Sequence, residues 1–449
     1  MNVHLIAIGG SAMHNMALAL HHKGFKVSGS DDAIFEPSKS RLEAHGLLPK
    51  EMGWFPEKIH TKLDAILLGM HARADNAELK KAQVLGIPIF SYPEYIYEHS
   101  KEKKRVVIGG SHGKTSITAI ILHVLKYANI DCDYMVGAQL KGFDTMVKLT
   151  NEAPIIVLEG DEYLSSPIDL RPKFHWYKPH LAVLSGIAWD HINVFPTFEN
   201  YVDQFRIFAN DVKEKLFYYA HDVPLQTVCQ GRLSCQVQAY ETPKHVIEED
   251  ISYLVDGDKR IPLQVFGEHN LQNIQAAQLV CSSLGVEKSC FYEAIQTFRG
   301  ANKRLELIKR TKSSALYKDF AHSPSKLMAT TKAMKQQYPK RQLVACMELH
   351  TFSSLNKSFL KEYNGSMNEA DIAIVFFSKE ALKHKKLENI TPTDIYQSFG
   401  KNDLQVITNA HDLVECLKDI EWQNTNLLMM SSGNFDGLDF TKLLTLLED

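Results

Sequence analysis

The stretch Val106-Val107-Ile108-Gly109-Gly110-Ser111-His112-Gly113-Lys114-Thr115 decides the fold. It contains a short apolar strand and a glycine-rich turn, and the residues that follow, to about residue 126, have apolar positions at helical spacing. Glycines let backbone N–H groups approach phosphate oxygens closely, and the amino end of a helix adds positive potential. The order of strand, glycine turn and helix therefore predicts a phosphate-binding loop in a parallel α/β sheet.

The loop supplies the candidate nucleotide-binding residues. Lys114 would place a point charge toward the β- and γ-phosphates, and Thr115 would offer a hydroxyl to Mg²⁺. The strict phosphate-loop pattern has glycine where this chain has Ile108, so the loop alone predicts binding of a nucleoside triphosphate and nothing narrower. The full candidate set is Gly110, Ser111, His112, Gly113, Lys114, Thr115 and Ser116.

Two polar residues follow neighbouring strands downstream. Glu159 comes directly after the apolar strand 155–158, and His191 comes soon after the strand 181–184. The carboxyl ends of parallel strands meet at the edge that carries the phosphate loop, so both side chains are expected to reach the nucleotide. Considered alone, His191 would more often be a structural histidine.

Outward from the loop, the same alternation of short strand, turn and amphipathic helix repeats along all 449 residues. It predicts an α/β protein of three domains: an N-terminal Rossmann-like domain over 1–100, a central nucleotide-binding domain over 101–298, and a C-terminal Rossmann-like domain over 299–449. Expected strands in the last domain lie near 343–347, 372–377, 404–407 and 427–430.

The N-terminal block opens with a strand over 3–8 and a second glycine turn. The turn lacks the third glycine of a dinucleotide-binding motif, and Asp31 lies near the position at which an acid meets a ribose hydroxyl. Alone, this pattern suggests a nicotinamide enzyme, which a separate triphosphate loop disfavours. The candidate residues here are Gly9, Gly10, Ser11, Ala12 and Asp31.

Two further motifs carry candidate residues. His269 and Asn273 are four residues apart and share one helical face with Asn270 beside them, and amides suit the donor and acceptor edge of adenine; helix capping is an equally good explanation for this motif. An arginine at 304 could clamp a transferring phosphoryl group. Asp319 and His322 follow within a short polar motif.

Composition excludes several classes of partner. The net charge of −3 gives no electrostatic case for nucleic acid, and no apolar run is long enough to span a membrane. Seven scattered cysteines without a C-x-x-C pair favour reduced thiols, so a cytoplasmic protein is expected. The sequence leaves a monomer and a homodimer both open.

Taken in order, these motifs resemble those of the Mur ligases, which build the cytoplasmic precursor of peptidoglycan. The resemblance covers essentially the whole chain. The opening Ile8-Gly9-Gly10 and Ser28-Gly29-Ser30-Asp31 look like the sugar-nucleotide domain of the UDP-N-acetylmuramate branch. Within that branch, residues 159–163, residues 169–177 and the Phe320-Ala321 pair are similar to ligases that add a recovered tripeptide, L-alanyl-γ-D-glutamyl-meso-diaminopimelate. The alternative acceptor is free L-alanine.

The resemblance implies an ATP- and Mg²⁺-dependent amide ligase that acts through an acyl phosphate in cell-wall synthesis. It implies that Thr115, Glu159 and His191 hold Mg²⁺, and that the N-terminal turn and Asp31 bind UDP-N-acetylmuramate. The implied catalytic residues are Lys114, Glu159, His191, Arg304 and His322, and the implied ATP contacts beyond the loop are His269, Asn270, Asn273, Arg304 and Asp319.

The chain also departs from the family pattern. Gly186, Ala188 and His350 stand where the family has other residues, and Lys303 and Ser323 replace a usual arginine and histidine. Gly186, Ala188 and His350 keep open a different class, a nucleotide-binding protein without catalysis.

Overall fold

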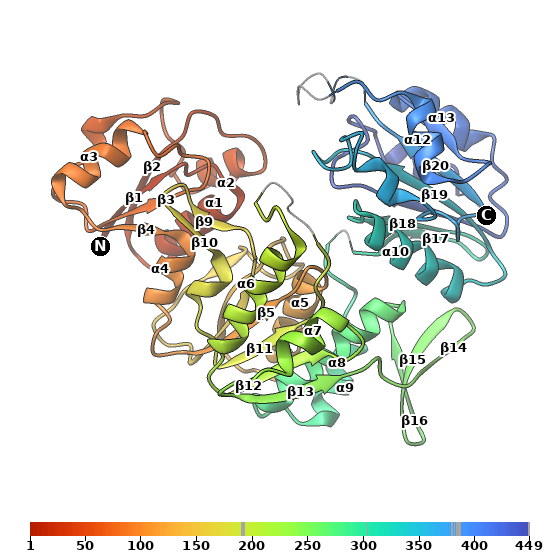
Figure 1. The fold of residues 1–449 in the computed structure, drawn as a ribbon, viewed down its shortest axis with the longest axis horizontal. Helices are drawn as coiled ribbons and strands as arrows, with labels where there is room; N and C mark the ends of the chain where they lie inside the picture. The colour runs from red at the N-terminus through yellow and green to blue at the C-terminus, as the bar shows by residue number, and fades with distance from the viewer. Residues whose placement is uncertain (190–193, 303, 379, 381, 383–387, 448–449) are drawn as a thin grey trace. The chain divides into compact units, whose positions relative to one another are not determined.

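The computed structural model describes residues 1–189, 194–302, 304–378, 380, 382 and 388–447. Within them, three sheets built mainly from parallel strands alternate with helices, as Figure 1 shows, so the expected α/β class is confirmed. The chain divides into two compact units, Met1–Thr242 with Gln272–Ile295, and Pro243–Leu271 with Gln296–Asp449. Domain boundaries near 100 and 298 stay predictions.

The first sheet has four parallel strands in the order β2-β1-β3-β4. Its strands are β1 (Asn2–Ile6), β2 (Lys26–Ser30), β3 (Ala65–Leu68) and β4 (Ile89–Ser91). Helix α1 (Ser11–His22) follows β1 and buries most of its first three turns. The glycine turn at residues 9 and 10 therefore lies at the carboxyl edge of this sheet.

The second sheet has seven strands in the order β13-β12-β11-β5-β8-β6-β7. Its centre is formed by β11 (Leu181–Leu184), β5 (Lys104–Gly109) and β8 (Ile155–Glu159), which are parallel and fully buried apart from the first residue of β5. Ile108 pairs with Glu159, and Gly109 pairs with Leu184. This register brings the phosphate loop and Glu159 to the same edge.

The flanks of this sheet complete the first unit. Helix α5 (Lys114–Tyr127) begins at the loop, and helix α4 (Tyr92–Glu98) leads out of the first sheet. The outer strands are β12 (Lys215–Tyr219) and β13 (Gln236–Tyr240) on one side and β6 (Cys132–Met135) and β7 (Val147–Lys148) on the other. Helices α6 (Phe198–Asn210), α7 (Val223–Cys229) and α9 (Lys288–Ile295) also belong to this unit.

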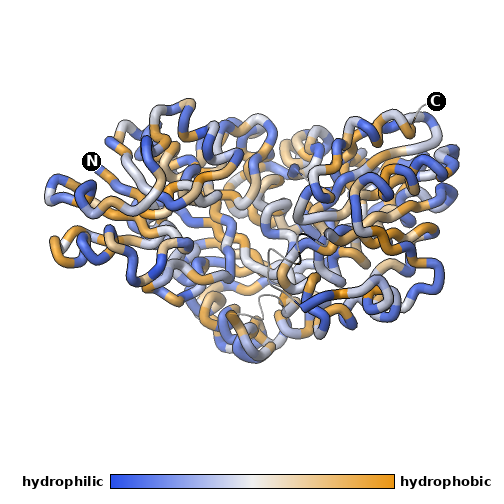
Figure 2. Tube along the Cα trace, turned by 90° about the horizontal axis from the view of Figure 1, so that it is seen from above, coloured by the Kyte–Doolittle hydropathy of each residue, from blue (hydrophilic) through white to orange (hydrophobic). Residues whose placement is uncertain are grey.

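One hydrophobic core joins the first two sheets. A single cluster of buried residues includes Leu18 and Tyr95 from the first sheet's helices and Val107 and Phe174 from the second sheet's region. The Asn15 carboxamide oxygen also accepts a 3.0 Å hydrogen bond from the backbone N–H of Met146. Figure 2 shows the alternation of hydrophobic and hydrophilic segments along the trace that such cores require.

The third sheet has six strands in the order β17-β18-β22-β19-β20-β21, with only β17 antiparallel to its neighbour. Alternate residues of β19 enter two different clusters: Leu343, Ala345 and Met347 join one, and Val344 and Cys346 join the other. Both faces of the strand are therefore covered, which explains its continuous apolar run. The strands are β17 (Glu306–Arg310), β18 (Ala315–Asp319), β19 (Gln342–Glu348), β20 (Ile372–Phe376), β21 (Gln405–Ile407) and β22 (Thr425–Met430).

A small antiparallel sheet was not expected from the sequence. It consists of β14 (His245–Glu248), β15 (Ile251–Asp256) and β16 (Lys259–Leu263) and belongs to the second unit. Ser252 donates a 2.7 Å hydrogen bond to Gln337 at the end of helix α10 (Pro324–Gln337), which ties the sheet to the C-terminal part. In the described part of the chain, no helix combines the length and apolarity needed to cross a membrane.

Candidate active site

The phosphate loop requires glycine at two positions. Gly110 and Gly113 have φ values of +125° and +78°, which L side chains rarely adopt. A Cβ atom at Gly110 would lie 2.9 Å from the Ser185 backbone nitrogen, and one at Gly113 would collide with the Asn273 carboxamide oxygen. The loop is thus pressed between the segment after β11 and helix α8 (Glu268–Ser283), at the amino end of α5.

Lys114 is held inside the loop by an acidic partner. Its Nζ donates to the Gly110 carbonyl at 2.7 Å and to Glu162 Oε2 at 2.6 Å. Burial alone would lower the pKa of Lys114, but the nearby carboxylates of Glu162 and Asp161 outweigh it and raise the pKa. Lys114 therefore remains a cation at neutral pH and can face a polyphosphate.

Glu162 connects this lysine to a buried network that sequence reasoning did not identify. The Glu162 side chain is 1% exposed and accepts a 2.9 Å hydrogen bond from the Tyr201 hydroxyl. Tyr201 also bonds Ser111 Oγ at 2.9 Å, and Ser111 Oγ accepts from the Ala188 N–H. The only available signal was the proximity of Glu162 to Glu159 in sequence.

Thr115 and Glu159 form a pair of hard oxygen groups beside the loop. The Thr115 hydroxyl donates to Glu159 Oε1 at 2.9 Å, and the Gly137 N–H donates to Oε2 at 2.7 Å. Burial raises the pKa of Glu159, against the effects of Gly137, Lys114 and Thr115. A hydroxyl and a buried carboxylate fit a Mg²⁺ ion, which takes oxygen ligands and would stabilise the ionised form.

The third expected metal ligand, His191, lies outside the described residues. Among those that the structure describes, no group of three or more histidine, cysteine, aspartate or glutamate side chains could hold a metal ion. The structure thus brings Thr115 and Glu159 together.

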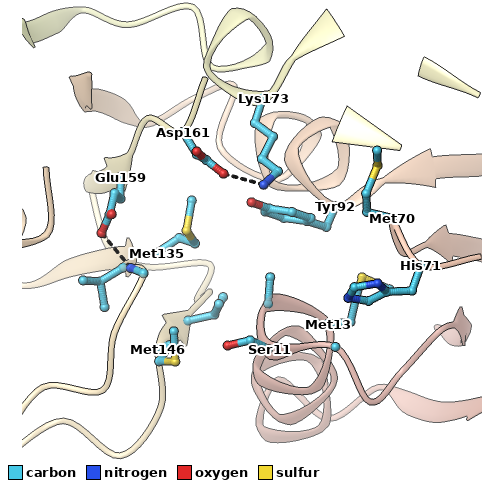
Figure 3. A pocket seen from close by; sticks show the side chains of 15 residues that line it. Ser11, Met13, Met70, His71, Tyr92, Met135, Met146, Glu159, Asp161 and Lys173 are labelled. Carbon is cyan, nitrogen blue, oxygen red and sulfur yellow. Dashed lines mark hydrogen bonds and ion pairs between the residues drawn. The ribbon is translucent and has the colours of Figure 1, made fainter. Parts of the chain in front are cut away.

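A cavity of about 390 Å³ opens beside Glu159 (Figure 3). It lies within the first unit, and the N-terminal turn and Glu159, the carboxylate expected to bind Mg²⁺, line the same space. Its lining residues are Gly10, Ser11, Ala12, Met13, Met70, His71, Tyr92, Met135, Val136, Gly137, Met146, Val147, Glu159, Asp161 and Lys173.

Asp31 shapes the turn that lines this cavity. Its carboxylate Oδ2 accepts a 2.7 Å hydrogen bond from the Gly9 N–H, and the side chain is almost fully buried. A Cβ atom at Gly9 would lie 2.8 Å from Ile34, so the turn tolerates only glycine there. Asp31 therefore holds the turn in the described structure, whether or not it also contacts a ribose.

Lys173 gives the cavity a positive charge. It forms an ion pair with Asp161, and its Nζ lies 5.6 Å from the centroid of the Tyr92 ring. Figure 3 shows Lys173 and Asp161 joined at the cavity wall with Tyr92 beside them. Lys173 belongs to the 169–177 segment, which resembles the tripeptide-adding ligases, and the sequence did not predict it as a site residue.

The amide motif on α8 divides between local and loop contacts. Asn270 donates a 2.8 Å hydrogen bond to the Phe266 carbonyl, whereas Asn273 lies against Gly113 of the phosphate loop. Burial lowers the pKa of His269, so the ring is neutral at pH 7. Contact with adenine stays a prediction for all three residues.

Arg304, Asp319 and His322 come together in the second unit at the carboxyl end of β18. The two oxygens of Asp319 accept 2.6 Å hydrogen bonds from the N–H groups of Leu305 and Ala321. The Arg304 guanidinium lies over the Phe320 ring at 4.7 Å, and that ring packs against His322. Asp319 therefore fixes the turn that carries Arg304; Lys303 lies outside the described residues.

A buried glutamate lies beside a histidine at the carboxyl end of β19. Glu348 is 2% exposed and accepts hydrogen bonds from the Ser431 hydroxyl and, at 2.8 Å, from the Phe435 N–H. His350 Nδ1 lies 3.6 Å from Glu348. A Cβ atom at Gly433 would lie 2.7 Å from the His350 ring, so the loop after β22 packs tightly onto this pair.

Comparison with known proteins gives a consistent answer. Residues 2–104 match the model of the Mur ligase family catalytic domain, and residues 108–281 match that of the Mur ligase middle domain. The UDP-N-acetylmuramate–L-alanine ligase of Roseiflexus sp. (strain RS-1) is 25% identical, over 98% of this chain and 94% of that protein.

Solved structures share the fold. Superposition on UDP-N-acetylmuramate-alanine ligase MurC from Thermotoga maritima gives a TM-score of 0.73 at 19% identity and covers 99% of both chains. The murein peptide ligase Mpl from Psychrobacter arcticus gives 0.66 at 21% identity, over 99% of this chain and 98% of that one. The chain belongs to the Mur ligase family, whose members are ATP-dependent amide ligases.

Proposed function

We propose that this ligase joins the lactyl carboxylate of UDP-N-acetylmuramate to the amine of L-alanyl-γ-D-glutamyl-meso-diaminopimelate, in the recycling of cell-wall peptides. The observation that carries the proposal is the cavity shared by the N-terminal turn and Glu159. A donor that binds the turn at Gly10 and Ser11 could extend its carboxylate along this cavity toward the phosphate loop.

The chemistry follows from the charges on the loop side of the cavity. A carboxylate and a polyphosphate repel each other, so catalysis depends on positioning and on cations placed between them. Lys114 would turn from Glu162 toward the γ-phosphate as the donor carboxylate attacks phosphorus and ADP leaves. The resulting acyl phosphate is then attacked by the acceptor amine, and phosphate departs as the amide bond closes.

Mg²⁺ would be held by Thr115 and Glu159, with His191 as the third proposed ligand. It would supply positive charge to the phosphoryl oxygens during transfer. Arg304 and His322 are also proposed as catalytic residues, and Asp319 holds the turn that positions Arg304.

The acceptor assignment rests on the segment after Glu159. Residues 164–172 form an antiparallel hairpin of β9 (Leu164–Ser166) and β10 (Asp169–Pro172), followed by the short helix η2 (Lys173–Trp176). This is the segment that resembles tripeptide ligases. L-Alanine is the second candidate acceptor, favoured by the name of the Roseiflexus relative.

Phosphate release decides between the acceptors. The chain is incubated with ATP, Mg²⁺ and UDP-N-acetylmuramate, and either tripeptide or L-alanine is added at equal concentration. Faster release with tripeptide is expected, and faster release with L-alanine would overturn the recycling assignment. Failure of both acceptors, with ATP still bound tightly, would favour the binding protein without catalysis that Gly186 and Ala188 suggest.

A further inference from the structure

The cavity beside Glu159 has an unbalanced set of charges. Among the residues that line it, two are carboxylates, Glu159 and Asp161, and Lys173 is the one lysine or arginine. A donor that enters with its own carboxylate would add a third negative charge to this partly buried space. Such a group needs a cationic partner, because an unpaired charge is costly to remove from water.

The backbone fixes Lys173 in place for such a role. Its N–H donates to the Tyr163 carbonyl at 2.9 Å, and the next residue, Phe174, donates to the Asp161 carbonyl at 3.1 Å and is fully buried. The Lys173 side chain is 14% exposed and points along the cavity wall, as Figure 3 shows. Ordering this side chain on ligand binding would therefore cost little conformational entropy.

Lys114 is not available for the same task. It lies on the loop side, bonded to Gly110 and Glu162, where its charge serves the phosphates. We propose that Lys173 binds the lactyl carboxylate of the donor and presents it to the phosphate loop. This inference rests on the proposed function and assigns the donor's reacting group a specific partner.

Asp161 is the carboxylate that pairs with Lys173 before the donor binds. The ammonium group of Lys173 has three donors, so it can bond Asp161 and a donor carboxylate together. The negative charge of Asp161 opposes the entry of the donor, although it keeps Lys173 oriented while the cavity is empty. Removal of the Asp161 charge should therefore leave donor binding as strong as before or stronger.

Four methionines make much of the remaining cavity wall apolar and adaptable. Methionine side chains fill irregular spaces around small apolar groups, so they would suit the methyl groups of the lactyl ether and the acetamide. The methionines concerned are Met13, Met70, Met135 and Met146.

The test is calorimetric binding of two sugar nucleotides to the full chain, with Mg²⁺ and a non-hydrolysable ATP analogue present and no acceptor. UDP-N-acetylglucosamine lacks the lactyl ether and serves as the probe without a carboxylate. Lys173→Met should weaken UDP-N-acetylmuramate binding about 10- to 100-fold, the range expected for a hydrogen bond to a charged group. Binding of UDP-N-acetylglucosamine should change less than about twofold.

Three further variants separate charge from folding. Lys173→Arg keeps the charge and should retain donor binding within several-fold, and Asp161→Asn should bind the donor at least as tightly as the unmodified chain. Lys178→Met is the matched control, because Lys178 forms a 2.6 Å ion pair with Asp211 outside the cavity lining. It should bind both nucleotides normally.

Unchanged UDP-N-acetylmuramate affinity in Lys173→Met would overturn the inference, as would equal losses for both nucleotides or for the methionine and arginine variants. The unmodified chain reports separately on the proposed function. If it binds UDP-N-acetylmuramate but does not ligate it, the proposed function fails while the Lys173 assignment stands.

Discussion

Glu159 and Glu348 occupy equivalent places in two different sheets, since each is the last residue of an interior parallel strand. Their environments shift the two pKa values in opposite directions. Burial raises the pKa of Glu159. Burial would also raise the pKa of Glu348, but the nearby His350 ring and the hydrogen bonds from Ser431 and the Phe435 N–H outweigh it, so that pKa is lowered.

The difference shows how one topology yields two kinds of carboxylate. Glu348 accepts hydrogen bonds from the loop after β22 and so holds that loop against the end of its own sheet. Glu159 receives one backbone N–H and one hydroxyl, which leaves it able to accept a cation. Strand-end position alone therefore does not separate an acid that is proposed to bind a ligand from a structural one; these two glutamates differ in their local donors.

The largest effect, on ligase turnover, is expected at the sheet edge that carries the phosphate loop. Lys114→Ala should lower ligase turnover by about 100- to 1000-fold, because it removes the charge that we propose to face the transferring phosphoryl group. Lys126→Ala, in the last turn of the same helix, is the control and should keep normal turnover. Near-normal turnover in Lys114→Ala would place the chemistry elsewhere.

A smaller effect, on stability, is expected for Glu348 at the carboxyl end of β19. Glu348→Gln should reduce the free energy of unfolding by about 1–3 kcal/mol at pH 7, because a neutral amide oxygen accepts weaker hydrogen bonds than the ionised carboxylate does. The folded pKa is lowered, so this stability is present above the ordinary value of 4.5 and is lost as pH falls through the folded pKa. Urea unfolding at pH 7 and pH 4 measures both. A variant as stable as the unmodified chain at pH 7 would remove the structural role of Glu348.

The smallest change in the free energy of unfolding is expected for Glu159→Gln in the absence of ligands. The folded pKa of Glu159 is raised, so its charged form destabilises the fold above the ordinary value of 4.5, and stability increases as pH falls through the folded pKa. The variant should therefore be as stable as the unmodified chain at pH 7 or more stable, by at most about 1 kcal/mol, although ligase activity is lost. The same urea titrations apply. Clear destabilisation at pH 7 would make the two glutamates alike.

Much of the fold could be predicted because apolar runs and glycine turns are local signals. The strand expected over 181–184 is observed with those bounds, and α5 extends the expected helix by only a residue or two. The β14–β16 sheet was missed because its strands are only partly buried, so none forms the continuous apolar run that marks the buried parallel strands.

Within the candidate site, strand order predicted that Glu159 would reach the edge that carries the phosphate loop, since parallel strands bring their carboxyl ends to one edge. It did not predict Glu162, Tyr201 or Lys173, because their positions depend on how a hairpin and a distant helix fold back onto the loop. Asp319 was expected as an ATP contact. In the structure, its two carboxylate oxygens accept backbone hydrogen bonds that hold the turn carrying Arg304, and contact with ATP stays a prediction.

The division of the chain also constrains how its parts could be exchanged by recombination. The second unit consists of Pro243–Leu271 and Gln296–Asp449, and the intervening segment belongs to the first unit. A gene fragment that began at residue 296 would encode Gln337 and Arg341 without their partners Ser252 and Asp250. A chimera that borrows this unit from a relative must therefore inherit both segments together.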